Sequence, residues 1–308
     1  MKKAILILTA LILALALGLI AAPADRAESP QTSVVPPDVQ WAFHIDMQKL
    51  TSSTLFKGLL EEKGPAKMKG KADQLLGKLK IDPMKDLKGI TVFGRAKKDE
   101  DAVVALKGKF DKAHLLGLIK AEESHKEVPY GKSTIYSWDG DDFGAFAADD
   151  LILLSESEEA IKLALDALEK NKKDVSAFPF LARTMKDSPN AIFVAAVNSI
   201  SGLVGEKGKP VILSKMRQAS GAISESGENV NFKVSIAAES AQVARDVEQA
   251  IRGLIAMANL QLADAEAQSF AQSIKIVVDG ENVRIDASYP ASKLMGLARG
   301  KAKNLSFF

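Results

Sequence analysis

The feature that most constrains the fold of this chain is an internal repeat. Residues 37–46 and 189–198 share one layout: a proline, an apolar strand and a final Asx residue, Asp46 in one copy and Asn198 in the other. In residues 37–46 apolar and polar positions alternate, which is typical of a half-buried strand. Self-similarity of this kind indicates a duplicated supersecondary unit. We therefore expect two related halves that join between residues 171 and 189.

Each half continues with the same order of elements. Both first strands lead into helical sequence, over 50–60 and 200–204. The periodicity of the first half then predicts a hairpin over 88–96 and 101–110, a helix over 112–121, strands over 143–147 and 151–154 and a helix over 157–169. The second half predicts a hairpin over 220–226 and 229–237, a helix over 240–262, strands over 274–278 and 283–286 and a helix over 291–299.

This order predicts an α+β fold. It consists of two related β-α-ββα-ββα units with antiparallel sheets and with helices packed on one face. The pattern leaves open whether the halves form two sheets or one continuous sheet. We expect the first repeat over residues 38–175 and the second over 176–308, preceded by an extended linker over 25–37.

The N-terminus has the layout of a secretory signal peptide. Lys2 and Lys3 precede an uncharged run over 4–19, and Ala22-Pro23-Ala24 offers the small residues that a signal peptidase reads. We therefore expect residues 1–24 to be removed before Asp25, leaving a periplasmic or secreted protein. The alternative is an uncleaved anchor helix, although the run is short for a bilayer span.

Charge and cysteine content exclude several classes of function. The whole chain has a formal charge of +2, and removal of residues 1–24 takes away two lysines, which leaves a neutral chain. A neutral chain has no overall electrostatic basis for binding nucleic acid. With no cysteine and only three histidines, the sequence predicts no thiol chemistry, no metal centre and no cofactor. The absence of cysteine also suits an oxidising compartment.

The mature N-terminus resembles a known group of proteins. Pro36-Pro37-Asp38 before an apolar strand that ends in Asp46, after a signal peptide and ahead of a repeated α+β body, is similar to bacterial secreted proteins of unknown function. The resemblance supplies no catalytic residues.

Two short motifs suggest ligands and are better explained as turns. Gly131-Lys132-Ser133 resembles the end of a phosphate-binding loop, but Lys126 stands where that loop needs glycine and a strand follows instead of a helix. The acidic run over 139–142 suggests calcium, yet Phe143 breaks the spacing of ligands in an EF-hand loop. Asp139-Gly140 favours a tight hairpin turn.

Enzymatic motifs are missing from the sequence. Neither Gly-x-Ser-x-Gly nor Ser-x-x-Lys occurs. We expect His44, His114 and His125 to be structural or solvated. Asp46 is expected to cap the helix that follows it. A catalytic interpretation would require His44, Asp46 and another carboxylate on one face.

A lysine-rich segment over 63–80 is the candidate for a contact with anionic lipid headgroups or acidic polymers. A solvated helix and loop with apolar residues facing the core is the alternative. The candidate lysines are Lys63, Lys67, Lys69, Lys71, Lys78 and Lys80.

Three functional hypotheses remain. The first is an exported, non-enzymatic protein that binds an envelope protein or organises the envelope. The second is a carrier that holds a lipid or another apolar ligand between sheet and helices, in space left by small residues such as those of 143–148. The third is an enzyme of unrecognised type. The helix over 240–262 could present Met257 and Leu260 to a partner, although packing against the sheet is the simpler expectation.

Overall fold

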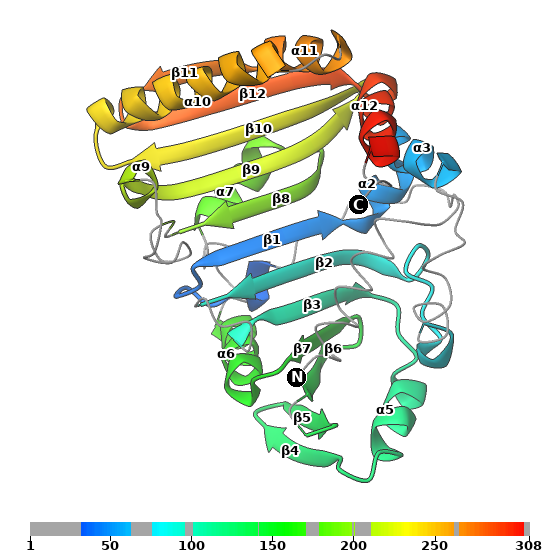
Figure 1. Cartoon of the computed structure of the whole chain (residues 1–308). Helices are drawn as coiled ribbons and strands as arrows, with labels where there is room; N and C mark the ends of the chain where they lie inside the picture. The colour runs from blue at the N-terminus through cyan, green and yellow to red at the C-terminus, as the bar shows by residue number, and fades with distance from the viewer. Residues whose placement is uncertain are drawn as a thin grey trace.

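The computed structural model describes residues 32–62, 76–95, 101–140, 142–170, 179–198, 200, 211–261 and 265–304. Its described strands form one continuous antiparallel sheet of twelve strands (Figure 1). The elements are η1 (Thr32–Val34), β1 (Trp41–Asp46), α2 (Met47–Ser52), α3 (Thr54–Glu62), β2 (Leu87–Gly94), β3 (Val103–Gly108), α5 (Lys112–Lys120), β4 (Lys126–Tyr130), β5 (Ser133–Trp138), β6 (Asp142–Ala148), β7 (Leu151–Ser155), α6 (Glu158–Lys170), α7 (Pro179–Asp187), β8 (Ala191–Val197), α9 (Val211–Ser214), β9 (Met216–Ser226), β10 (Asn229–Ala238), α10 (Ala241–Gln261), α11 (Ala265–Gln272), β11 (Lys275–Asp279), β12 (Asn282–Pro290) and α12 (Ala291–Asn304).

The repeat is visible in the strand order. The sheet runs β11-β12-β10-β9-β8-β1-β2-β3-β7-β6-β5-β4. The order β1-β2-β3-β7-β6 in the first half matches β8-β9-β10-β12-β11 in the second. The halves join where β1 pairs with β8. The first half has one additional hairpin, β4–β5, on its outer side.

The α+β class and the antiparallel pairing are as predicted. All strands predicted from the repeat are present, within a few residues of the expected bounds. Strand β4 and helices α7, α9 and α11 were not predicted. The helical segment expected over 200–204 lies almost entirely outside the described residues, and of it only Ile200 is described, as helical.

Helices cover both faces of the sheet, which differs from the expected single face. Alternate residues of β3 belong to different cores: Val103 and Ala105 pack with α6, whereas Val104 and Leu106 pack with Phe56 of α3 and Leu115 of α5. Successive side chains of a strand point to opposite faces, so these helices lie on opposite faces. The reason is that β2, β3 and β7 are apolar on both sides and need a cover on each.

The second half has the same two faces. Leu181 of α7 packs with Val194 and Ala222 in the first of these cores. Val243 and Val247 of α10 pack against Ile276 and Val283 in a separate core. We call the surface of the sheet that α6 and α7 cover the α7 face. The opposite surface, which α3, α5 and α10 cover, is the α10 face.

The segment before β1 is not an extended linker where it is described. From Thr32 the chain forms η1, and Val34 and Val35 are fully buried against the core beneath α6. The apolar side chains of Val34, Val35 and Val39 account for this, because burying them stabilises the fold. The expectation for 25–31 lies outside the described residues.

Candidate functional site

The middle of the α10 face is an apolar surface that the described helices leave partly open. Along β1 the buried residues are Ala42, His44 and Asp46, which point to the α7 face, whereas Trp41 and Phe43 are only half-buried. Strand β8 has the same alternation. Figure 1 shows β9, β8 and β1 with no described helix drawn in front of them. Hydropathy alone would predict the opposite burial in β1, with Trp41 and Phe43 buried and the polar side chains exposed.

An aromatic row forms one part of this surface. The Trp41 and Phe43 rings are stacked with centroids 6.3 Å apart, and the Phe43 and Phe193 centroids are 6.0 Å apart. Trp41 lies directly over Gly94, where an added Cβ would come within 2.6 Å of the indole. Glycine is therefore the residue that lets the indole lie flat on the sheet.

Next to this row the surface is formed by small side chains. Phe43 pairs with Ala195, Ala195 pairs with Gly221, and Gly221 pairs with Val234, so all four lie in one row across the sheet. A Cβ added at Gly221 would have no neighbour nearer than 3.5 Å. Beyond it, Val234 is 36 % exposed. Ala195 and Gly221 thus form a low strip between larger apolar residues.

Helix α10 borders the surface on the other side. Arg252 of α10 donates to the carbonyl of Ile276 on β11, so this side of the helix faces the edge strand. At 100° per residue, Leu254 and Met257 lie about half a turn away, on the side over β10. They are 61 % and 54 % exposed. We call Trp41, Phe43, Phe193, Ala195, Gly221, Val234, Leu254 and Met257 the central apolar surface.

The expected packing of Met257 and Leu260 against the sheet is wrong. Leu260 is 88 % exposed and lies on the side of α10 that points away from the strands. The buried stripe of α10 is made by Val243, Val247 and their neighbours nearer the start of the helix. The apolar stripe of α10 therefore continues beyond the residues that the sheet buries.

A buried polar cluster lies behind the surface, on the α7 face. His44 Nδ1 is 2.9 Å from Thr91 Oγ1, its cross-strand neighbour. Burial is the main cause that lowers the pKa of His44 to about 4, with Asp46 raising it and Lys49 lowering it. The imidazole is therefore neutral at neutral pH. Its burial and its contact with Thr91 are compatible with the expected structural role.

Asp46 caps the following helix, as predicted, because its carboxylate accepts the Lys49 backbone N–H at 2.9 Å. The Lys49 ammonium lies 2.9 Å from the same carboxylate and donates to the Pro189 carbonyl of the second half. Asn198 differs from its counterpart. Its amide donates to the Val39 carbonyl and accepts from Gln218.

The arrangement that would have revived a catalytic interpretation is not formed. His44 and Asp46 share a face, but the third charged neighbour is Lys49 instead of a carboxylate. His114 bonds the Lys78 carbonyl and His125 the Glu122 carbonyl, and both histidines are half-buried. In the described part of the chain, no three His, Asp or Glu side chains are grouped to hold a metal ion.

The lysine candidates are only partly described. Lys63, Lys67, Lys69 and Lys71 lie outside the described residues. Lys78 and Lys80 are exposed, as a solvent or polymer contact requires, and Leu76 and Leu79 pack against the core. The contact with anionic surfaces stays a prediction.

Both suspected ligand motifs occur at turns. Gly131 has φ of 57° and connects β4 to β5. Asp139 and Gly140 have φ of 50° and 90°, which are the positive values that a tight hairpin turn between β5 and β6 requires. The space expected beside Gly144 is filled, because a Cβ there would lie 2.9 Å from the Trp138 ring.

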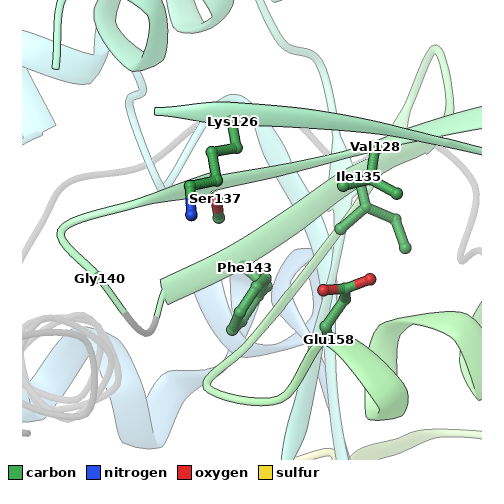
Figure 2. A pocket seen from close by; sticks show the side chains of 7 residues that line it. All are labelled: Lys126, Val128, Ile135, Ser137, Gly140, Phe143 and Glu158. Atoms are coloured by element: carbon green, nitrogen blue, oxygen red, sulfur yellow. The ribbon is translucent and has the colours of Figure 1, made fainter. Parts of the chain in front are cut away.

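A small pocket of about 160 Å³ lies on β4–β6 at the start of α6. Figure 2 shows Lys126, Ser137 and Phe143 on the strands and Glu158 at the beginning of α6. Glu158 already holds Lys162 at 2.8 Å. The volume is below the range of about 300–1,000 Å³ that is typical of small-molecule sites. The central apolar surface is therefore the stronger candidate site.

The described architecture defines a class: a duplicated α+β protein built on one antiparallel sheet, with an apolar surface at its centre. No protein-family model and no curated protein matches the chain. Among solved structures, crystal form I of TP0453 has a TM-score of 0.49 at 10 % identity and covers 88 % of this chain and 97 % of its own. Crystal form III has a TM-score of 0.46 at 9 % identity, covering 87 % and 97 %.

Among the described residues, no helix combines the length and apolar character needed to cross a bilayer.

Proposed function

We propose that this chain is an exported, non-enzymatic binding protein that holds an apolar ligand, such as a lipid acyl chain, on the central apolar surface. The observation that carries the proposal is the exposure of Leu254 and Met257 on the side of α10 that lies over β10. A contiguous exposed apolar patch on a folded protein marks an interaction site.

The shape of the surface favours a slim ligand. Ala195 and Gly221 lie between Phe43 on one side and Val234 on the other. Neighbouring strands are about 4.8 Å apart, so this strip is wide enough for one extended hydrocarbon chain. The flat Trp41–Phe43 stack offers contact area with few rotamers to fix.

The tryptophans allow a direct test, because the chain has only two, Trp41 and Trp138. Trp41 is in the central apolar surface, whereas Trp138 lies on β5, five strands away from β1. Trp138→Phe leaves Trp41 as the reporter, and Trp41→Phe leaves Trp138. Both variants would be titrated with dibromostearic acid, a heavy-atom quencher attached to an acyl chain.

We expect saturable quenching in Trp138→Phe and little in Trp41→Phe. Equal quenching of both reporters would indicate non-specific partitioning, and no quenching of Trp41 would exclude an acyl ligand there. Either result would overturn the proposal.

Export rests on the N-terminal sequence pattern. The test is the native mass of the protein recovered from the envelope fraction of cells that produce it. A mass that matches residues 25–308 would support cleavage, and the full-length mass would favour the uncleaved anchor. A mass with a defined adduct that is lost on denaturation would identify the ligand.

A further inference from the structure

The two edges of the described sheet differ in how they are protected. One edge is β4, which begins with Lys126 and Glu127 and contains Pro129. Proline has no N–H and, with charged side chains, is a common way to prevent further strand pairing. The other edge is β11, with the sequence Lys-Ile-Val-Val-Asp over 275–279. It contains no proline, and its charges are only at its ends.

The repeat shows that β11 occupies a position that accepts another strand. Its counterpart in the first half is β6, which pairs with β7 on one side and with β5 on the other. Strand β11 pairs with β12, the counterpart of β7, and no described strand lies on its outer side. Among the described residues of the second half, none form a hairpin equivalent to β4–β5 at this position.

We propose that the outer edge of β11 binds β11 of a second copy of this chain, antiparallel around a two-fold axis at Val277. The strand is complementary to itself in this register. Lys275 of each copy is opposite Asp279 of the other, Ile276 is opposite Val278, and Val277 faces its own counterpart. Such an isologous contact uses the same patch on both subunits.

The exposure of the side chains fits this pairing. Lys275, Val277 and Asp279 point to the α7 face and are exposed, Val277 at 46 %. Neither Lys275 nor Asp279 forms an ion pair with another described side chain. Pairing would place each charge next to its opposite and bury Val277 against its copy.

The backbone N–H and C=O groups of β11 also alternate in direction as the proposed pairing requires. Gly280 and Glu281 form a two-residue hairpin loop, so Asp279, Val277 and Lys275 direct their backbone groups to β12. The N–H and C=O groups of Ile276 and Val278 therefore point outward. They can form the hydrogen-bonded pairs on either side of the axis.

Arg252 of α10 forms a hydrogen bond to this edge. Its guanidinium donates to the Ile276 carbonyl at 3.2 Å from α10, which lies on the α10 face. A carbonyl oxygen has two acceptor lone pairs, so it can also accept a partner's N–H in the plane of the sheet. For the N–H groups of Ile276 and Val278 and for the Val278 carbonyl, the described residues provide no such hydrogen bond.

The first test is cross-linking, since the natural chain has no cysteine. In the proposed register the two copies of residue 277 form a non-hydrogen-bonded pair, with Cα atoms about 4.5 Å apart, which permits a disulfide. We expect Val277→Cys to oxidise to a disulfide-linked dimer. Val128→Cys is the matched control, because Val128 is exposed at the β4 edge. It should stay monomeric.

The second test is charge reversal, measured by sedimentation. Lys275→Asp would place like charges opposite each other twice in the dimer and should raise the dissociation constant about tenfold or more. The double variant Lys275→Asp/Asp279→Lys restores both pairs and should dimerise like the natural chain. A natural chain that sediments as a monomer, with a Val277→Cys variant that forms no disulfide-linked dimer, would overturn the proposal. A dimer whose dissociation constant is the same in Lys275→Asp as in the natural chain would also overturn it.

Discussion

Phe43 and Ala195 pair directly with each other where β1 meets β8, and each occupies the position that the repeat assigns to the other. An approximate two-fold axis therefore passes through this pair and relates the halves of the continuous sheet. The neighbouring positions follow the same symmetry. Thr91 lies opposite His44, and Ser220 lies opposite the equivalent Ala196, both with buried hydroxyls.

The symmetry is broken at the pair on the axis, since one half supplies a phenyl ring and the other a methyl group. The difference in size produces the step between the aromatic row and the low strip of Ala195 and Gly221. A duplicated scaffold thus acquires an asymmetric surface through single substitutions. The binding proposal depends on this asymmetry.

Replacing Leu254 and Met257 with glutamine should weaken acyl binding without unfolding the protein. Both side chains are mostly exposed, so little burial is lost from the fold. Loss of two apolar contacts should lower the affinity for dibromostearic acid about tenfold. Leu260→Gln is the control, because Leu260 is on the same helix and points away from the sheet. Equal effects of the two changes would contradict the location of the site.

Glu225→Gln should destabilise helix α3. The Glu225 carboxylate on β9 accepts the backbone N–H groups of Thr54 and Leu55, at 2.7 and 2.6 Å, and so caps the helix from the other half. Loss of the charge should reduce the free energy of unfolding by about 1 kcal/mol. Urea denaturation measures this change. Glu228→Gln, at an exposed position on the same hairpin, should have no effect.

Gly94→Ala should disturb the aromatic row. The new methyl group would be 2.6 Å from the Trp41 ring, so the indole must move off the strand. We expect a cost of about 1–3 kcal/mol and a red shift of Trp41 fluorescence in the Trp138→Phe background. Gly117→Ala on α5 meets nothing within 4 Å and should stabilise the chain by about 0.5–1 kcal/mol. An unshifted spectrum in Gly94→Ala would show that the indole does not lie on Gly94.

Stability should fall on acidification because of His44. The folded pKa is lowered to about 4 by burial, whereas the unfolded value is 6.5, so the unfolded chain binds more protons between these values. Stability due to neutral His44 is complete above pH 6.5 and is lost as the pH falls toward 4, by about 3 kcal/mol in total.

His44→Gln keeps a polar group beside Thr91 but cannot titrate. It should flatten the dependence of unfolding free energy on pH in this range. His125→Gln is the control, since His125 is only half-buried and lies in a loop. If the two variants have the same pH profile as the natural chain, the buried imidazole is not the group responsible.

Much of the fold followed from local patterns. The alternation in β1 and β8 and the paired hairpins of each half predicted strands that the structure contains. Asp46 was recognised as a helix cap, because capping depends on residues next to one another in the sequence. Strand β4 was not predicted, because its residues lack the apolar alternation of the other strands. It contains Pro129 and two charged residues.

The sequence by itself determined the α+β class, the duplication and the turns at Gly131 and Asp139-Gly140, because each depends on short-range periodicity or on local backbone preference. Only the tertiary structure decided that the halves share one sheet, that helices cover both faces and that Trp41, Phe43 and Leu254 remain partly open. Those outcomes depend on which strand pairs with which and on where each helix packs. Such contacts join residues far apart in the chain, and no local pattern encodes them.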